Sequence, residues 1–161
     1  MRYCAVAAAL LLAAPLSAQS AEDAPVYDEA WHNRQQLALA ELRAEDGWQV
    51  LPGGLRWRRV AGDGTGLMPT VDDMVMINYV GTFIDGTEFD NSRKRDTAAV
   101  FPLGRLIKAW QMTVPLMGVG DTIEIYAPAD LAYGPMGRGS IPGNATLKFT
   151  IELLAVPRKA L

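Results

Sequence analysis

The chain has 161 residues, 50% of them hydrophobic, and its 15 Lys and Arg against 18 Asp and Glu give a formal net charge of -3. This length suits one ordinary domain with a short appendage. A nearly balanced chain lacks the basic surface that nucleic acid or an anionic membrane requires, so we expect neither as a partner. One cysteine, Cys4, and one histidine, His32, cannot supply a zinc or iron–sulfur ligand set, so we expect no metal and no cofactor.

Residues 1–20 have the three parts of a secretory signal peptide: a positively charged start, ten apolar residues over 5–14, and a run of small residues over 17–21. Ten apolar residues in a helix span only about half of the roughly 30 Å hydrocarbon core, so an uncleaved membrane anchor is the weaker alternative. Cleavage fits after Ser20 or after Ala18. The remaining chain contains no cysteine, and we expect it to be periplasmic or secreted from a bacterium.

Residues 21–50 are predicted to form a helical extension. The stretch from Tyr27 to Asp46 has no Gly or Pro and is rich in good helix formers, so it predicts one helix that Gly47 ends. Its apolar stripe is narrow and consists of Trp31, Gln35, Leu39 and Leu42. Such a stripe fits two arrangements equally well, a helix that lies on its own domain and a helix that pairs with a second copy in a homodimer.

Residues 51–161 are predicted to form the main domain. Apolar residues alternate with polar ones over 55–60, 75–79, 122–126 and 147–153, which predicts half-buried strands. Asp85-Gly86 predicts a hairpin turn, with a return strand over 87–90. Apolar residues at helical spacing over 106–114 predict one short helix of about two turns. An antiparallel sheet with one apolar face and one helix to cover it indicates an α+β fold.

Seven separated motifs of this domain carry a resemblance. They are Tyr79-Val80-Gly81-Thr82, Gly86-Thr87-Glu88-Phe89-Asp90, Phe101-Pro102-Leu103, Leu106-Ile107 with Trp110, Leu131-Ala132-Tyr133-Gly134, Ile141-Pro142 and Leu147-Lys148-Phe149. In this order and spacing, over roughly residues 55–156, the chain resembles the FKBP-type peptidyl-prolyl cis–trans isomerases. The resemblance implies an antiparallel curved β-sheet wrapped over one short α-helix and preceded by an N-terminal helix.

The resemblance also implies the site. It gives catalytic roles to Asp90, Tyr79, Phe89, Trp110 and Tyr133, with Trp110 as the pocket floor and Asp90 as the one carboxylate at its rim. It gives substrate contacts to Phe101, Leu106, Ile107, Ile141 and Phe149. Taken singly, the aromatic residues among these would be ordinary core residues, since burial is the commonest fate of such rings. Only their joint order indicates a pocket.

Two positions depart from the family pattern. Ala99 stands where eukaryotic members carry a further pocket aromatic, which predicts a more open pocket and weaker binding of bulky macrolide inhibitors. Ala109 stands where a glycine usually precedes the tryptophan; it favours helix by up to about 1 kcal/mol but could crowd the pocket floor.

The composition fits the chemistry of this family. Rotation of an Xaa–Pro amide must overcome a barrier of about 18–20 kcal/mol that arises from resonance across the C–N bond. A dry, apolar pocket disfavours the planar, dipolar ground state more than the twisted transition state, and no nucleophile is required. We therefore predict an isomerase that acts on proline-containing exported polypeptides. The alternative is a binding module or holdase chaperone with little catalysis; a hydrolase based on Ser92 or Ser140 has no base at a supporting spacing.

Overall fold

The computed structural model describes residues 27–95 and 97–157, so the predicted signal peptide and its cleavage site lie outside the described residues. The described chain forms a seven-stranded antiparallel sheet in the order β1-β2-β6-β7-β3-β4, with β5 paired to β3 off this path. The strands are β1 (Gln49–Val50), β2 (Arg56–Ala61), β3 (Met74–Phe83), β4 (Glu88–Asn91), β5 (Ala99–Pro102), β6 (Thr122–Ala127) and β7 (Leu147–Ala155).

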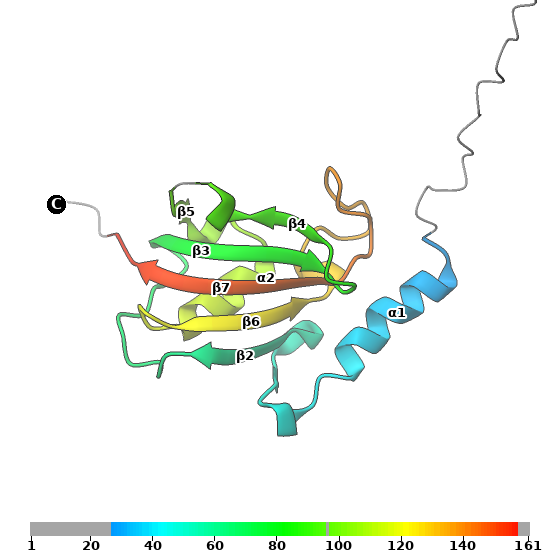
Figure 1. Ribbon diagram of the computed structural model, residues 1–161, viewed down its shortest axis with the longest axis horizontal. Helices are drawn as coiled ribbons and strands as arrows, with labels where there is room; N and C mark the ends of the chain where they lie inside the picture. The colour runs from blue at the N-terminus through cyan, green and yellow to red at the C-terminus, as the bar shows by residue number, and fades with distance from the viewer. Residues whose placement is uncertain (1–26, 96, 158–161) are drawn as a thin grey trace, which may run out of the picture.

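Two α-helices accompany the sheet, α1 (Glu29–Ala40) and α2 (Lys108–Thr113). Helix α2 crosses behind β3, β7 and β6, whereas α1 lies at one end of the sheet (Figure 1). Short 3-10 segments cover Ala44–Asp46, Pro52–Gly54, Ser92–Lys94, Leu103–Arg105, Val114–Leu116 and Ala129–Leu131. This arrangement confirms the predicted α+β fold. Within 27–95 and 97–157, no helix is long and apolar enough to cross a membrane.

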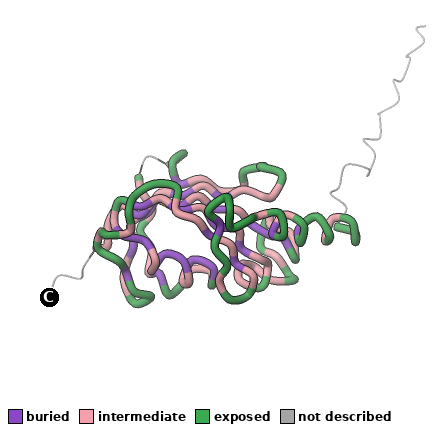
Figure 2. Tube along the Cα trace, turned by 90° about the horizontal axis from the view of Figure 1, so that it is seen from below, coloured by how far each residue is buried: buried purple, intermediate pink, exposed green. Residues whose placement is uncertain are grey.

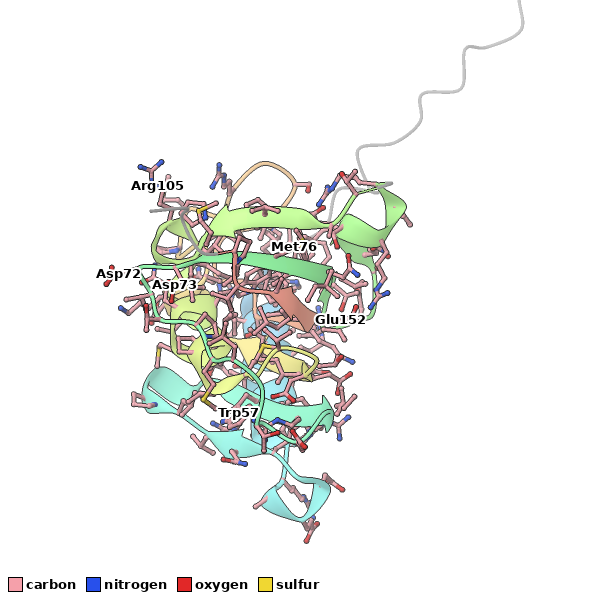
Figure 3. All side chains as sticks on the ribbon, turned by 90° about the vertical axis from the view of Figure 1, so that its left-hand side faces the viewer. Trp57, Asp72, Asp73, Met76, Arg105 and Glu152 are labelled. Atoms are coloured by element: carbon pink, nitrogen blue, oxygen red, sulfur yellow. The ribbon has the colours of Figure 1, made fainter. Side chains whose placement is uncertain are left out.

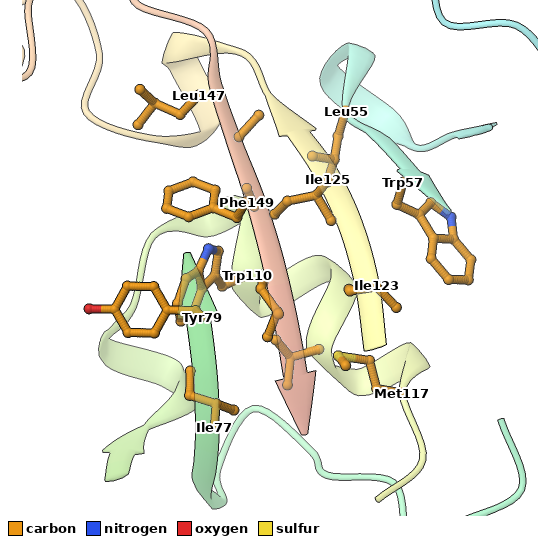
Figure 4. Packing of buried hydrophobic residues seen from close by; sticks show 14 of the residues in the cluster. Leu55, Trp57, Ile77, Tyr79, Trp110, Met117, Ile123, Ile125, Leu147 and Phe149 are labelled. Carbon is orange, nitrogen blue, oxygen red and sulfur yellow. The ribbon is translucent and has the colours of Figure 1, made fainter. Parts of the chain in front are cut away.

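The core lies between the sheet and α2. Strands β3 and β7 alternate buried and half-buried residues along their length, as the period of two predicted. Figure 2 shows the buried segments facing the interior while the exposed ones gather in the outer turns. Figure 4 shows side chains of β6 and β7 packed with Trp110 and Met117, so the short helix is held by apolar contacts with the sheet.

A backbone contact joins the start of β3 to the turn after β5. There the segment before β3, with Asp72 and Asp73, approaches the 3-10 turn that ends at Arg105 (Figure 3). The backbone N–H of Leu103 donates to the carbonyl of Asp73 at 3.0 Å, and so joins this turn to the start of β3. This anchors the chain between β5 and α2 and thereby sets where α2 begins.

Several of the sequence-based element boundaries need correction. Strands β1 and β5 were not predicted, because two and four residues are too few to show a period and β5 ends in a proline. The short helix covers only residues 108–113, since Leu106 and Ile107 have extended backbone. The predicted strand at 75–79 extends to Phe83, because β7 pairs with it as far as that residue and β4 as far as Thr82.

Helix α1 is shorter than the prediction of Tyr27–Asp46. Asp28 caps its start by accepting from the backbone N–H of Trp31 at 2.8 Å, and the helix ends at Ala40. The chain then turns so that the Trp48 side chain, 6% exposed, packs edge-on against Tyr126. Burial of this tryptophan outweighs the modest helix propensity of the intervening residues.

The stripe on α1 packs on its own domain. Gln35 and Leu39 are buried, and the backbone N–H of Thr146 donates to Gln35 Oε1 at 3.0 Å. The first of the two predicted arrangements is therefore what the structure shows. A homodimer through α1 stays a prediction, and it would have to use another face of this helix.

Candidate active site

A cavity of about 160 Å³ is lined by residues of β3, β4, β5, β7 and α2 and of the adjoining loops. Nine of the ten predicted site residues line it: Tyr79, Phe89, Asp90, Phe101, Leu106, Ile107, Trp110, Tyr133 and Phe149. The tenth, Ile141, lines an adjoining hollow together with Phe89, Asp90 and Tyr133. The fold thus gathers residues from four strands, one helix and two loops at a single place.

Trp110 on α2 forms the floor of this cavity and is 4% exposed. Its ring meets Tyr79 at 5.1 Å and Phe149 at 5.3 Å between centroids, both nearly perpendicular (Figure 4). Such edge-to-face contacts hold the rings in one arrangement. The indole Nε1 is buried and has no hydrogen-bond acceptor among the described residues. The floor is therefore rigid and apolar, with one N–H left unpaired.

The wall on the β4 side depends on Gly81. This residue of β3 lies opposite Asp90 of β4 and opposite Phe149 of β7. A Cβ at Gly81 would lie 2.7 Å from the ring of Phe89 and 3.1 Å from that of Phe149. Phe89 and Phe149 pack at 5.7 Å with an interplanar angle of 90°. A residue without a side chain at position 81 is what lets these two rings stand side by side.

The polar rim is a three-residue network. The Tyr79 hydroxyl donates to Asp90 Oδ2 at 2.5 Å, Arg95 Nη1 donates to Asp90 Oδ1 at 2.9 Å, and Arg95 Nη2 donates to the Tyr79 oxygen at 2.8 Å. Sequence reasoning missed Arg95. The only signal was the basic run at 93–95 that follows the return strand, and such a run is typical of a solvated surface.

This network shifts the pKa values of Tyr79 and Asp90. Burial, together with the hydrogen bond and charge of Asp90, raises the pKa of Tyr79 to about 12 against the opposing effect of Arg95. For Asp90, burial raises the pKa, but the hydrogen bonds from Tyr79 and Arg95 and the guanidinium charge outweigh it, so the pKa lies below its ordinary value. The rim therefore holds a neutral phenol beside a charged carboxylate across the ordinary pH range.

A backbone donor faces the same region. Ile107 precedes α2, and its N–H makes no hydrogen bond among the described residues, whereas the carbonyl of Leu106 accepts from Gln111 Nε2 at 2.7 Å. The Ile107 N–H is thus the free backbone group at this wall of the cavity, and the Leu106 carbonyl is held in place. A substrate carbonyl would find one donor here.

The loop before β7 forms the mouth. Tyr133, Ile141 and Arg138 line a hollow of about 300 Å³ that adjoins the cavity. The Arg138 guanidinium carbon lies 5.9 Å from the centre of the Tyr133 ring, within the range of a cation–π contact. The mouth therefore combines an aromatic hydroxyl with a positive charge.

The described side chains do not form a nucleophilic or metal site at this cavity. Ser92 is buried, and its Oγ accepts from the N–H of Tyr79 at 2.7 Å and donates to that residue's carbonyl at 3.3 Å, so it fastens β3 to the turn after β4. His32 lies on α1, where its Nε2 lies 3.2 Å from Asn144 Nδ2. No group of three or more His, Cys, Asp or Glu among residues 27–95 and 97–157 could hold a metal ion.

The fold and the site define a protein with an aromatic cavity that has room for a small apolar group and has a polar rim. The sequence profile described as FKBP-type peptidyl-prolyl cis-trans isomerase matches residues 66–154. The chain belongs to this family.

Sequence similarity to curated proteins supports this family assignment. The chain is 43% identical over 122 residues to the FKBP-type peptidyl-prolyl cis-trans isomerase FkpA of Aeromonas hydrophila, covering 76% of this chain and 45% of that protein. It is 41% identical over 123 residues to the outer membrane protein MIP of Legionella longbeachae, covering 76% and 52%. The chain thus spans about half the length of these curated relatives.

Solved structures show the same fold. A peptidyl-prolyl cis-trans isomerase of Pseudomonas syringae pv. tomato superposes with a TM-score of 0.73 at 32% identity, over 84% of this chain and 98% of that one. The crystal structure of FkpA from Escherichia coli superposes with a TM-score of 0.72 at 36% identity, over 82% and 60%.

Proposed function

We propose that this protein accelerates cis–trans isomerisation of Xaa–Pro bonds. The observation that carries the proposal is the aromatic cavity over Trp110, which is lined by nine of the ten residues to which the resemblance gives site roles. Family membership supports the same activity, because the matched profile and the relatives carry that description.

The prolyl ring would sit on Trp110, between Tyr79, Phe89 and Phe149. In this dry site the planar amide loses the water that stabilises its dipole. The twisted amide has a smaller dipole, so it loses less solvation free energy. The barrier of about 18–20 kcal/mol falls by the difference between these two effects. No bond to the protein forms or breaks, in keeping with a cavity lined mainly by hydrocarbon and aromatic surface.

Three polar groups would orient the substrate. The Ile107 N–H would donate to the carbonyl that follows the proline, and the Tyr133 hydroxyl would donate at the mouth. The charged Asp90, held by Tyr79 and Arg95, would interact with the partly positive carbonyl carbon as the amide twists. Tyr79 and Arg95 act here as positioning residues for that carboxylate.

We further propose that the clients are exported polypeptides. The features that support this are the signal-peptide pattern of residues 1–20 and a relative that is itself named an outer membrane protein. Proline isomerisation is slow enough to limit folding, so such an activity is useful after export. Macrolide inhibitors would enter the same cavity, and Ala99 on β5 would leave them less aromatic contact.

The test is the cis-to-trans relaxation of a short Xaa–Pro peptide with the chain from Ala21 onward and with its Asp90→Ala and Trp110→Ala variants. We expect the parent to accelerate the relaxation and both variants to lose most of that acceleration. If the parent relaxes the peptide no faster than buffer but still suppresses aggregation of an unfolded protein, the chain is a binding module and the proposal is wrong.

A further inference from the structure

A second cavity, of about 320 Å³, is larger than the one over Trp110. It lies where α1, the β3–β4 turn and the loop before β7 meet, at the end of the sheet seen beside α1 in Figure 1. Trp31 of α1, Phe83 of β3 and Pro142 of the loop supply its apolar walls. Three segments far apart in the sequence thus build one hollow that the proposed prolyl site does not use.

The side-chain amide of Gln35 forms part of the wall of this cavity. Gln35 is 4% exposed and lines the cavity. Its Oε1 accepts from the backbone N–H of Thr146 at 3.0 Å, which decides the orientation of the amide. Its Nε2 then has no acceptor within the described part of the chain. Because this Nε2 is not fully enclosed, it can donate to water in the free protein and to the carbonyl of a ligand that replaces this water.

The hollow at the mouth of the proposed active site lies between that site and the second cavity and shares lining residues with each. Phe89, Asp90 and Tyr133 line both the prolyl cavity and the hollow at its mouth. Ser140 lines both that hollow and the second cavity. An extended polypeptide with its proline over Trp110 can therefore follow one path along the loop before β7 to α1, with its backbone carbonyls passing these residues.

We propose that the second cavity is a binding subsite for polypeptide clients. It takes one large apolar side chain of the same segment whose proline occupies the cavity over Trp110, and Gln35 Nε2 donates to a backbone carbonyl of that segment. This inference rests on the proposed isomerase function and adds a substrate preference to it: α1 becomes part of the substrate site.

The one charged residue that lines the cavity predicts the charge of the ligand. Asp85 is the only charged residue among those that line it. Its Oδ1 accepts from the Thr87 N–H at 2.8 Å, and Asp85 pairs with no cation among the described residues. A lysine or arginine next to the apolar side chain would complete this site, and its contribution would weaken with salt.

The experiment compares a short Xaa–Pro peptide with longer peptides that add one phenylalanine at increasing distances from the same proline. Alanine replaces the phenylalanine in matched peptides. The parent is compared with Thr87→Trp, which fills the second cavity from an exposed position, and with Leu37→Trp, which adds the same ring on the outward face of α1, where Leu37 is 57% exposed. Isomerisation rates and calorimetric binding are measured for each pair.

At one spacing, the phenylalanine peptide should show a KM and a Kd about tenfold lower than its alanine counterpart. Thr87→Trp should abolish this difference, Leu37→Trp should preserve it, and the short peptide should distinguish neither variant from the parent. The absence of a phenylalanine effect at every spacing overturns the subsite. Self-association of the parent that Thr87→Trp abolishes, with no phenylalanine effect, makes a second copy the occupant and also overturns it. Tight phenylalanine-dependent binding without any catalysis supports the subsite and overturns the isomerase.

Discussion

The hydroxyl of Tyr79 donates to Asp90 Oδ2 across β3 and β4, at the rim of the cavity over Trp110. The two strands are paired so that Gly81, two residues after Tyr79, stands opposite Asp90. The pairing therefore brings the phenol under the carboxylate, and Arg95 holds both from the side. The register between β3 and β4 therefore determines where the Asp90 carboxylate lies in the site.

Removal of Arg95 should change the titration of Asp90. The hydrogen bond and charge of Arg95 help to hold the pKa of Asp90 below its ordinary value, so Arg95→Gln should raise it. Because the folded pKa is lowered, Asp90 contributes stability above its unfolded pKa and loses it as pH falls through the folded pKa. In Arg95→Gln this contribution should be smaller, and its loss should be complete at a higher pH, because the folded pKa lies closer to the unfolded one.

The measurement is an NMR titration of the Asp90 carboxyl carbon, with the lower limb of the activity profile followed in parallel. Arg93→Gln is the control, because it removes the same charge from the same turn but its guanidinium binds Glu152 at 2.6 Å. An identical Asp90 titration in both variants would mean that Arg95 does not position the carboxylate.

Alkaline stability should depend on Tyr79. Its pKa is raised to about 12 from 10.0, so the phenol stabilises the fold fully below pH 10 and loses this contribution as pH rises through about 12. Urea unfolding of the parent and of Tyr79→Phe over this interval should show a steeper decline for the parent. Asp90→Asn should move the phenol titration to lower pH, since the hydrogen bond and charge of Asp90 raise it. Parallel declines in parent and Tyr79→Phe would contradict the assignment.

Two buried tryptophans offer a matched pair. Trp110 and Trp57 are 4% and 7% exposed, and both have an indole Nε1 without a partner among the described residues. Replacement of either by Phe should lower the free energy of unfolding by about 1–2 kcal/mol, since a cavity forms but an unpaired N–H disappears. Only Trp110→Phe should lower kcat/KM, by about tenfold or more. Equal activity in the two variants would remove Trp110 from the site.

Gly81→Ala should displace the Phe89 ring, which lines the cavity. The new methyl group would meet the Phe89 ring at 2.7 Å, so the ring must move. Overpacking of this kind costs about 1–3 kcal/mol of stability. Because Phe89 also lines the cavity, KM should rise more than stability alone explains, as peptide kinetics at a temperature where the variant is fully folded would reveal. Unchanged KM under those conditions would show that the Phe89 wall does not contact substrate.

The attachment of α1 should depend on Gln35 and not on its neighbour. Gln35→Ala leaves the N–H of buried Thr146 without its acceptor and should cost about 1–3 kcal/mol. Gln36 is exposed, so Gln36→Ala should change stability by no more than about 0.5 kcal/mol. Chemical denaturation of both variants measures the difference. If the two are equal, α1 does not depend on this hydrogen bond for its place on the domain.

The sequence by itself determined the alternating strands, the short helix and the set of residues around the cavity over Trp110. Alternation is a property of neighbours along the chain, because a half-buried strand exposes every second residue to water. That is why β3 and β7, with Ile77 and Phe149 on their buried faces, were predictable. The ordered motifs added which of the buried aromatic residues share one pocket.

Only the tertiary structure decided the contacts between residues far apart in sequence. Trp48, which follows α1, packs on Tyr126, Gln35 contacts Thr146, and Arg95 folds back from a turn onto Tyr79. No periodic pattern or fixed spacing in the sequence marks these contacts, because each depends on how loops bring separate surfaces together. The free energy of burial and of buried hydrogen bonds is gained only when both partners arrive. The second cavity beside α1 exists for the same reason, because no single segment of the chain contains it.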